Sequence, residues 1–156
     1  MRAVLAAGCM AMMMVTACAG QNATGEDDVD QVLETEELAQ GGNSSVRAER
    51  MTVIRDQQAF ERLWSETTAR GERPAVDFDQ HMVLAVFMGE RRTGGYRVQV
   101  EQVTREGDGL RVSVRMTAPG PNCMTTQALT QPYQVVRLPM VDGAVEFDVE
   151  QVEVDC

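Results

Sequence analysis

Few residues of this chain have the chemistry that catalysis requires. His81 is the single histidine among 156 residues. A serine-histidine-aspartate arrangement would need His81 beside Ser65 or Ser113, and neither serine stands in a nucleophile-elbow sequence. A thiol enzyme would need His81 beside Cys123 in its free form. A single histidine also excludes a multi-histidine metal site.

Paired carboxylates are the remaining candidates for acid–base chemistry or cation binding. Asp77 and Asp79 flank Phe78, so on an extended segment they face the same side. The alternative is that the two residues are simply polar positions that flank Phe78 ahead of a strand, and we favour that interpretation. The chain has no Walker loop and no dinucleotide fingerprint. We expect no catalytic residue, no metal site and no cofactor, and therefore a protein that is not an enzyme.

A glycine-rich loop is the first candidate for protein binding. Residues 89–96 read Gly-Glu-Arg-Arg-Thr-Gly-Gly-Tyr and follow the apolar run 82–88. Three glycines allow positive φ and leave little bulk at the tip of the loop. A strained turn without further role is the alternative. The partner-binding residues predicted here are Arg91, Arg92, Thr93, Gly94, Gly95 and Tyr96.

A proline-rich loop is the second candidate. Residues 118–123 read Ala-Pro-Gly-Pro-Asn-Cys, and Pro132 and Tyr133 stand at the head of the next strand. Prolines restrict the unbound ensemble, so such a loop loses less entropy on binding. We predict that Pro121, Pro132 and Tyr133 contribute to the same partner surface. Local packing of both Tyr96 and Tyr133 is the alternative.

Alternating and apolar segments predict the elements that carry these loops. Asp56 is a good N-cap for a helix of about 57–69, on which Phe60, Leu63 and Trp64 share one face. The pattern predicts a mainly β (α+β) fold, a β-sandwich-like domain of antiparallel strands with one N-terminal helix. The expected strands are 51–54, 82–88, 96–103, 110–116, 133–138 and a last one from 145.

The last expected strand changes phase along its length. Val145, Phe147 and Val149 alternate with acidic residues, but the apolar positions then move to Val152 and Val154. Such a slip is typical of a β-bulge or of a strand that crosses between sheets. We expect one of these near Gln151.

The N-terminus predicts export and lipidation. Arg2 and the apolar residues 3–15 form a short signal sequence, too short to span a bilayer, and Val15-Thr16-Ala17-Cys18 resembles a bacterial lipoprotein box. We expect a signal peptide over 1–17 and lipid on Cys18; an ordinary cleaved signal is the alternative. The predicted location is the cell envelope, lipid-anchored to the membrane. In a Gram-negative host this is the outer membrane, facing the periplasm or the cell surface.

The remaining cysteines fit an oxidising compartment. Cys9 leaves with the signal peptide and Cys18 takes lipid, which leaves Cys123 and Cys156 as an even pair. We predict that Cys123 and Cys156 form a disulfide. Two free thiols, or pairing of Cys156 with another molecule, are the alternatives.

An acidic segment separates the anchor from the domain. Seven acidic residues and no basic one lie between residues 19 and 45, and the whole chain has a formal net charge of −10. We expect residues 18–45 to be a lipid anchor and disordered flexible tether, and residues 46–156 to be the β-rich domain. A short helix over residues 32–38 that docks on the domain is the alternative for part of this segment. No basic face for nucleic acid is visible.

One ordered set of motifs resembles the PrcB C-terminal domain family. It comprises Leu63-Trp64, Asp77-Phe78, the apolar run 82–88, Gly89-Glu90, Thr93-Gly94-Gly95-Tyr96, Pro119-Gly120-Pro121, Ala128-Leu129-Thr130 and Pro132-Tyr133, over roughly residues 46–148. The resemblance implies a lipoprotein that is a non-catalytic accessory, stabilising subunit of a surface or periplasmic protease complex. The implied partner is an extracytoplasmic protease or another envelope protein.

A weaker likeness suggests another way of meeting a protease. Loops 89–96, 119–122 and 131–133 are similar to the three loops with which chagasin-type inhibitors enter a protease cleft, although the spacing is shorter and tyrosine replaces tryptophan. A protease inhibitor is thus the alternative function. Binding of envelope glycans ranks last, because aromatic residues are only 4% of the chain.

Overall fold

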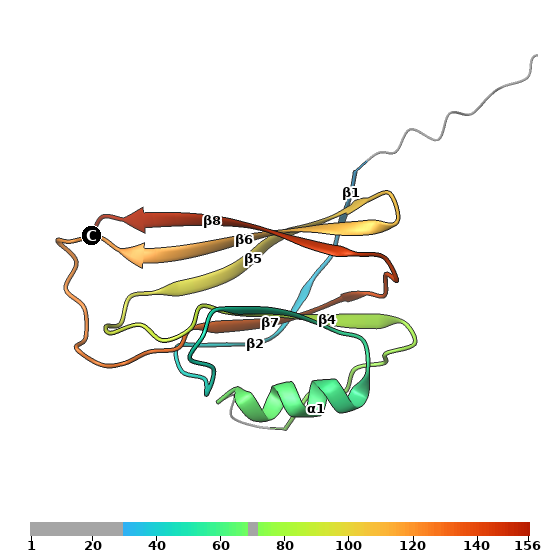
Figure 1. Cartoon of the computed structure of the whole chain (residues 1–156), viewed down its shortest axis with the longest axis horizontal. Coiled ribbons are helices and arrows are strands. Elements are labelled where there is room, and N and C mark those ends of the chain that lie inside the picture. Colours follow the sequence, from blue (N-terminus) through green and yellow to red (C-terminus); the bar gives the residue numbers. More distant parts are fainter. Residues whose placement is uncertain (1–29, 69–71) are drawn as a thin grey trace, which may run out of the picture.

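The computed structural model describes residues 30–68 and 72–156. Two four-stranded sheets lie face to face and one helix covers the outer face of the second sheet (Figure 1). Sheet A has the strand order β1-β5-β6-β8 and sheet B the order β2-β7-β4-β3. The elements are β1 (Gln31–Leu33), β2 (Glu36–Gly41), β3 (Arg50–Ile54), α1 (Gln57–Glu66), β4 (His81–Phe87), β5 (Arg97–Glu106), β6 (Gly109–Pro119), β7 (Tyr133–Pro139) and β8 (Val145–Val154). The predicted mainly β, sandwich-like fold is confirmed.

The position of β4 between two cores explains why its sequence is apolar without alternation. Met82, Leu84 and Val86 point into the core between the sheets, whereas Val83 and Phe87 point into a second core beneath α1. A strand buried on both faces has no polar side to present, so its sequence does not alternate. The three-layer arrangement of α1, sheet B and sheet A follows from these two cores.

Helix α1 begins as predicted and ends earlier. The Asp56 carboxylate accepts the Ala59 N–H at 2.8 Å, which satisfies one of the free amides of the first turn. Phe60 and Leu63 are buried, and Trp64 is half-buried against the Phe60 ring. The helix ends at Glu66 instead of near 69, because Thr67 is extended and its N–H bonds to Trp64 C=O.

The acidic segment is not wholly a tether. Residues 31–33 form β1 and pair with β5, and residues 36–41 form β2 and pair with β7. The prediction of a flexible segment up to residue 45 is therefore wrong from residue 31 onward. Edge strands bury only part of one face, so the few apolar residues here (Leu33, Leu38 and Ala39) suffice. Residues 18–29 and the predicted signal peptide lie outside the described residues.

Strand β8 corrects two further expectations. It pairs with β6 in parallel, so the sandwich is not entirely antiparallel. Its register with β6 runs unbroken from Leu110–Val145 to Pro119–Val154, so β8 has no bulge near Gln151. The apolar residues change side because Gln151 and Glu153, which take the core-side positions, stand where the core ends and a hollow begins.

Candidate protein-binding surface

The glycine-rich loop leaves β4 through a turn that requires glycine. Gly89 has φ +76°, and a Cβ there would lie 2.8 Å from the Glu49 backbone nitrogen. Gly95 has φ +89°, and a Cβ there would lie 3.1 Å from the Pro119 ring. Positive φ costs little only for glycine, so these two residues set the path of the loop. Gly95 also brings it against the proline-rich loop.

Backbone hydrogen bonds join the glycine-rich loop to residues 124–130, which continue the proline-rich loop toward β7. Arg91 N–H donates to Thr130 C=O at 2.8 Å, and Thr130 N–H donates back to Arg91 C=O at 2.9 Å. Gly94 N–H donates to Thr126 C=O at 2.9 Å. The Thr130 hydroxyl donates to Thr93 C=O at 2.8 Å. The loops therefore lie side by side at one end of the sandwich, the end that also holds the C-terminus (Figure 1).

A disulfide fixes the second loop to the C-terminus. Cys123 and Cys156 are bonded, with their Cα atoms 5.0 Å apart, which confirms the predicted pair. Next to it, Gly120 N–H donates to Val154 C=O at 2.8 Å. The proline-rich loop is thus held at one end by β8 and at the other by the glycine-rich loop.

Only some of the predicted partner-binding residues face solvent. Arg92, Gly95 and Pro121 are exposed, and Arg91, Thr93, Gly94 and Tyr96 are partly exposed. The Arg91 guanidinium lies over the Tyr96 ring, 5.8 Å from its centroid. This contact holds both side chains at the rim of the loops.

Pro132 and Tyr133 do not belong to the surface. Both are buried, and the Tyr133 ring stacks on Phe87 in the core beneath α1. Their prediction as contact residues is wrong, because β7 has already entered sheet B at this point. The sequence carried a signal: Tyr133 and Val135 alternate along one face of the strand, and both lie in that core.

Two apolar residues of the second loop were missed. Met124 is fully exposed and Leu129 is 58% exposed. Neither belongs to a strand or helix that would bury it, and both stand in an otherwise polar run. We call residues 91–96 and 121–129 together the loop surface. It combines exposed apolar side chains, two arginines and a half-exposed tyrosine, a composition common in protein interfaces.

The residues considered for catalysis take part in contacts that shape a turn, begin a strand or form the disulfide. The Asp77 carboxylate accepts the Asp79 N–H at 3.0 Å, and Asp77 C=O accepts the His81 N–H at 2.8 Å, so this pair shapes the turn into β4. His81 begins β4, whereas Cys123 is engaged in the disulfide. Within the described residues no group of histidine, cysteine and carboxylate side chains is arranged to bind a metal ion.

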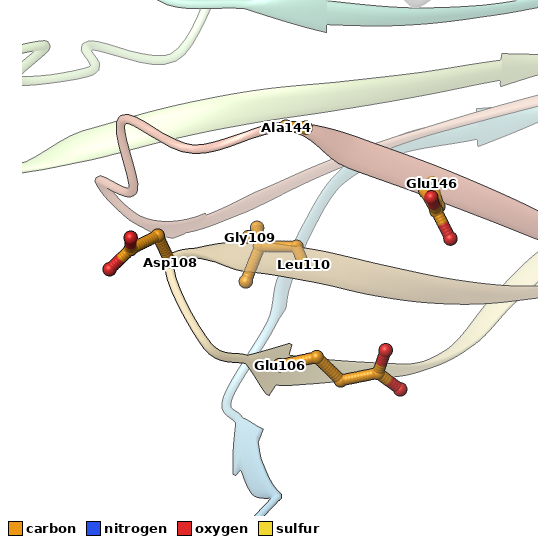
Figure 2. Close-up of a pocket in the computed structure, with 6 residues that line it drawn as sticks. All are labelled: Glu106, Asp108, Gly109, Leu110, Ala144 and Glu146. Carbon is orange, nitrogen blue, oxygen red and sulfur yellow. The ribbon is translucent and has the colours of Figure 1, made fainter. Parts of the chain in front are cut away.

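An acidic depression occupies the opposite end of sheet A. Figure 2 shows Glu106, Asp108 and Glu146 around the start of β6. Arg111 donates to Glu106 at 2.5 and 2.9 Å and lies 3.9 Å from Glu146. The hydrogen bond from Arg111 holds the pKa of the Glu106 carboxyl below its ordinary value. The Glu106 carboxylate is thus paired with Arg111, which favours its ionised form.

The predicted lipid site, Cys18, lies outside the described residues. No helix within residues 30–68 and 72–156 has the length and apolar character needed to cross a bilayer.

Comparison with known proteins supports the resemblance seen in the motifs. Residues 82–139 match the model of a family described as PrcB C-terminal. The matched region runs from β4 to β7 and includes the glycine- and proline-rich loops. No curated protein and no solved structure matches the chain significantly.

Proposed function

We propose that this protein is a non-catalytic, lipid-anchored accessory subunit. It binds an extracytoplasmic protease, or another protein of the cell envelope, and stabilises it. The PrcB C-terminal match over residues 82–139 supports this function class. The loop surface, which lies within the matched region, supplies the contact.

One observation carries the proposal: Met124 and Leu129 are exposed on a loop that is held in place by a disulfide and backbone hydrogen bonds. Covering exposed apolar side chains with a partner is favourable, by about 25 cal/mol for each Å² of apolar surface removed from water. The disulfide and the Arg91–Thr130 hydrogen bonds already order this loop. Its binding therefore loses less conformational entropy than that of a mobile loop.

The position of the loop surface also suits an anchored protein. Gln31, near the start of the described chain, pairs with Arg105 at one end of β5, whereas the glycine-rich loop precedes Arg97 at the other end. A ten-residue strand spans about 30 Å. With lipid on Cys18, the loop surface would point away from the membrane and toward a partner.

The inhibitor alternative loses support. A chagasin-like wedge needs three exposed loops, and Pro132 and Tyr133 of the third loop are buried. The two loops that remain are hydrogen-bonded to each other and do not supply three separate contacts. We therefore do not carry the inhibitor forward.

Affinity capture from cross-linked envelopes tests the proposal. We expect the native protein to capture a protease, and the Met124→Glu/Leu129→Glu variant to lose it. Val32→Glu is the matched control, because Val32 is also 58% exposed but lies on β1. The partner's half-life should fall when the protein is absent. Capture that survives Met124→Glu/Leu129→Glu would contradict the assigned surface.

Fractionation tests the anchor separately. Cys18→Ser removes the lipid site, so the protein should move from the membrane to the soluble envelope fraction. Retention of the Cys18→Ser protein in the membrane would refute lipidation as the means of attachment.

A further inference from the structure

Strand β8 is a long strand at the open edge of sheet A. Consecutive strands β1 and β2 occupy one edge of each sheet, so β8 and β3 are the opposite edges and lie on the same side of the sandwich. No strand in the described part of the chain pairs with the outer edge of β8. Because the N–H and C=O groups of successive residues point to opposite edges of a strand, every second residue of the ten in β8 presents backbone groups with which another strand can pair.

The core between the sheets is incompletely covered along this edge. The β6 register points Val145, Phe147 and Val149 toward the core, yet all three are only half-buried. Met51 and Val53 of β3 pack against the same core and are also half-buried. An added strand that carried apolar side chains on its inner face would bury these residues further.

A hollow of about 430 Å³ lies at the end of this edge, next to the glycine-rich loop. The buried residues Met88 and Met116 contribute apolar lining, and Arg91 and Tyr96 contribute from the glycine-rich loop. Gln151 and Glu153 of β8 also line it. The volume is sufficient for a large apolar side chain, and the polar groups around it can reach the backbone of an added segment.

The outer face of β8 is acidic. Glu146, Asp148 and Glu150 alternate with the core-side residues and are exposed. Arg111 lies 3.9 Å from Glu146, and Arg115 lies 3.0 Å from Glu150. Asp148 has no ion pair within the described residues. A neighbouring strand would therefore be favoured if its outer face carried Lys or Arg.

We propose that β8 accepts an extended segment of a partner polypeptide that alternates apolar and basic side chains. The segment pairs with β8 through its backbone. Its apolar side chains cover Phe147 and Val149, and one of them enters the hollow. Its basic side chains lie beside Glu146, Asp148 and Glu150. This site goes beyond the proposed function and is independent of Met124 and Leu129.

A second copy of this chain is a poor occupant. An antiparallel β8–β8 pair that kept apolar residues on the core side would place the acidic residues 146, 148 and 150 opposite one another. Like charges directly opposite across strands are destabilising. The acidic row thus acts against self-pairing and favours a basic partner.

Binding of a defined peptide tests the proposal with the full-length protein in detergent. The probe is a ten-residue labelled peptide that alternates valine or leucine with arginine, and its affinity is measured by fluorescence anisotropy. Two control peptides have glutamate in place of arginine, or N-methylated amides at alternate positions. We expect both changes to abolish binding. The amide hydrogens of residues 145–154 should exchange more slowly when the arginine peptide is bound.

Protein variants locate the site. Asp148→Lys should weaken the peptide by about fivefold. Glu72→Lys, a charge reversal on the exposed segment between α1 and β4, and Met124→Glu/Leu129→Glu should leave its affinity unchanged. The proposal is overturned if the arginine peptide does not bind, if the N-methylated peptide binds equally well, or if Asp148→Lys has no effect. Weakening by the loop variant would also overturn it, because the peptide would then bind at Met124 and Leu129 and not along β8.

Discussion

At the scale of single residues, glycines define the shape of the loop surface. Gly95 combines a positive φ with close packing against Pro119, whereas Gly107 has a positive φ (+56°) and open space around it. Gly42 has neither constraint. The three positions separate the cost of backbone conformation from the cost of a steric contact.

Alanine substitutions at these glycines should rank accordingly. Gly107→Ala should lower the free energy of unfolding by about 1–2 kcal/mol, the cost of the left-handed conformation for an L-residue. Gly95→Ala should cost more than Gly107→Ala, because the Pro119 ring must also move. Gly42→Ala should change stability by less than about 0.5 kcal/mol. Urea unfolding measures all three, and equal losses at Gly95 and Gly107 would show that the packing against Pro119 is slack.

The Glu106–Arg111 pair predicts one pH-dependent signal. The hydrogen bond from Arg111 lowers the Glu106 pKa below its ordinary 4.5. The pair therefore contributes fully above that value, and its contribution is lost as the pH falls through the lower folded pKa. Carboxyl NMR should give a Glu106 midpoint below 4.5 that rises in Arg111→Gln. Arg115→Gln should leave it unchanged; a shift there would mean that long-range charge, not the hydrogen bond, sets the value.

At the scale of elements, a buried glutamine links the two sheets. Gln134 of β7 is 6% exposed and faces sheet A. Its carbonyl oxygen accepts the Val100 N–H at 2.7 Å, where the β5–β6 register shifts between Val100 and Gln102. Its amide donates to Glu37 at 2.7 Å. Gln134 thus satisfies a backbone donor at the irregularity and ties β2 to the sandwich.

Replacing this glutamine should be costly despite similar size. Gln134→Leu leaves the Val100 N–H without its acceptor, which should lower the free energy of unfolding by about 1–3 kcal/mol. Glu37→Gln keeps an acceptor for the Gln134 amide and serves as the control with a small effect. Thermal unfolding distinguishes the two, and a neutral Gln134→Leu would indicate that water replaces the lost acceptor.

Sequence patterns predicted most helices and strands, but not the elements or strand directions that depend on which strands pair. The unbroken apolar run of β4 predicted a strand that is buried on both faces, and the alternation in β6 predicted a strand that is buried on one face. β1 and β2 were missed because acidic composition outweighed a few apolar residues. The parallel pairing of β8 could not be predicted, since alternation is the same for either strand direction. The loops were found, but Pro132 and Tyr133 show that a residue after a loop can already be core.

At the scale of the whole molecule, the Cys123–Cys156 bond closes the loop-bearing end. It joins residues 33 positions apart, and between them lie β7, β8 and residues 124–129 of the loop surface. Crosslinking a segment of this length removes conformational freedom from the unfolded chain. The bond also limits how far Met124 can move from the C-terminus.

Loss of the disulfide should destabilise the domain and loosen the loop surface. Cys123→Ser, Cys156→Ser and the double variant should each lower the free energy of unfolding by about 3–4 kcal/mol in the chain-entropy model. Guanidinium titration measures the loss. In all three variants, hydrogen exchange should accelerate relative to the native protein, and more at residues 121–129 than at β4. A double variant as stable as the native protein would mean that the Gly120–Val154 contact alone retains the C-terminus.

The path of β1 and β2 has a mechanical consequence. These consecutive strands belong to different sheets, so the chain is fastened first to β5 and then to β7. A pull entering at Gln31 must strip β1 from sheet A before it reaches β2, and β2 before it reaches the rest of sheet B. Two ladders in series therefore shield the centre of the domain from tension applied through its N-terminus.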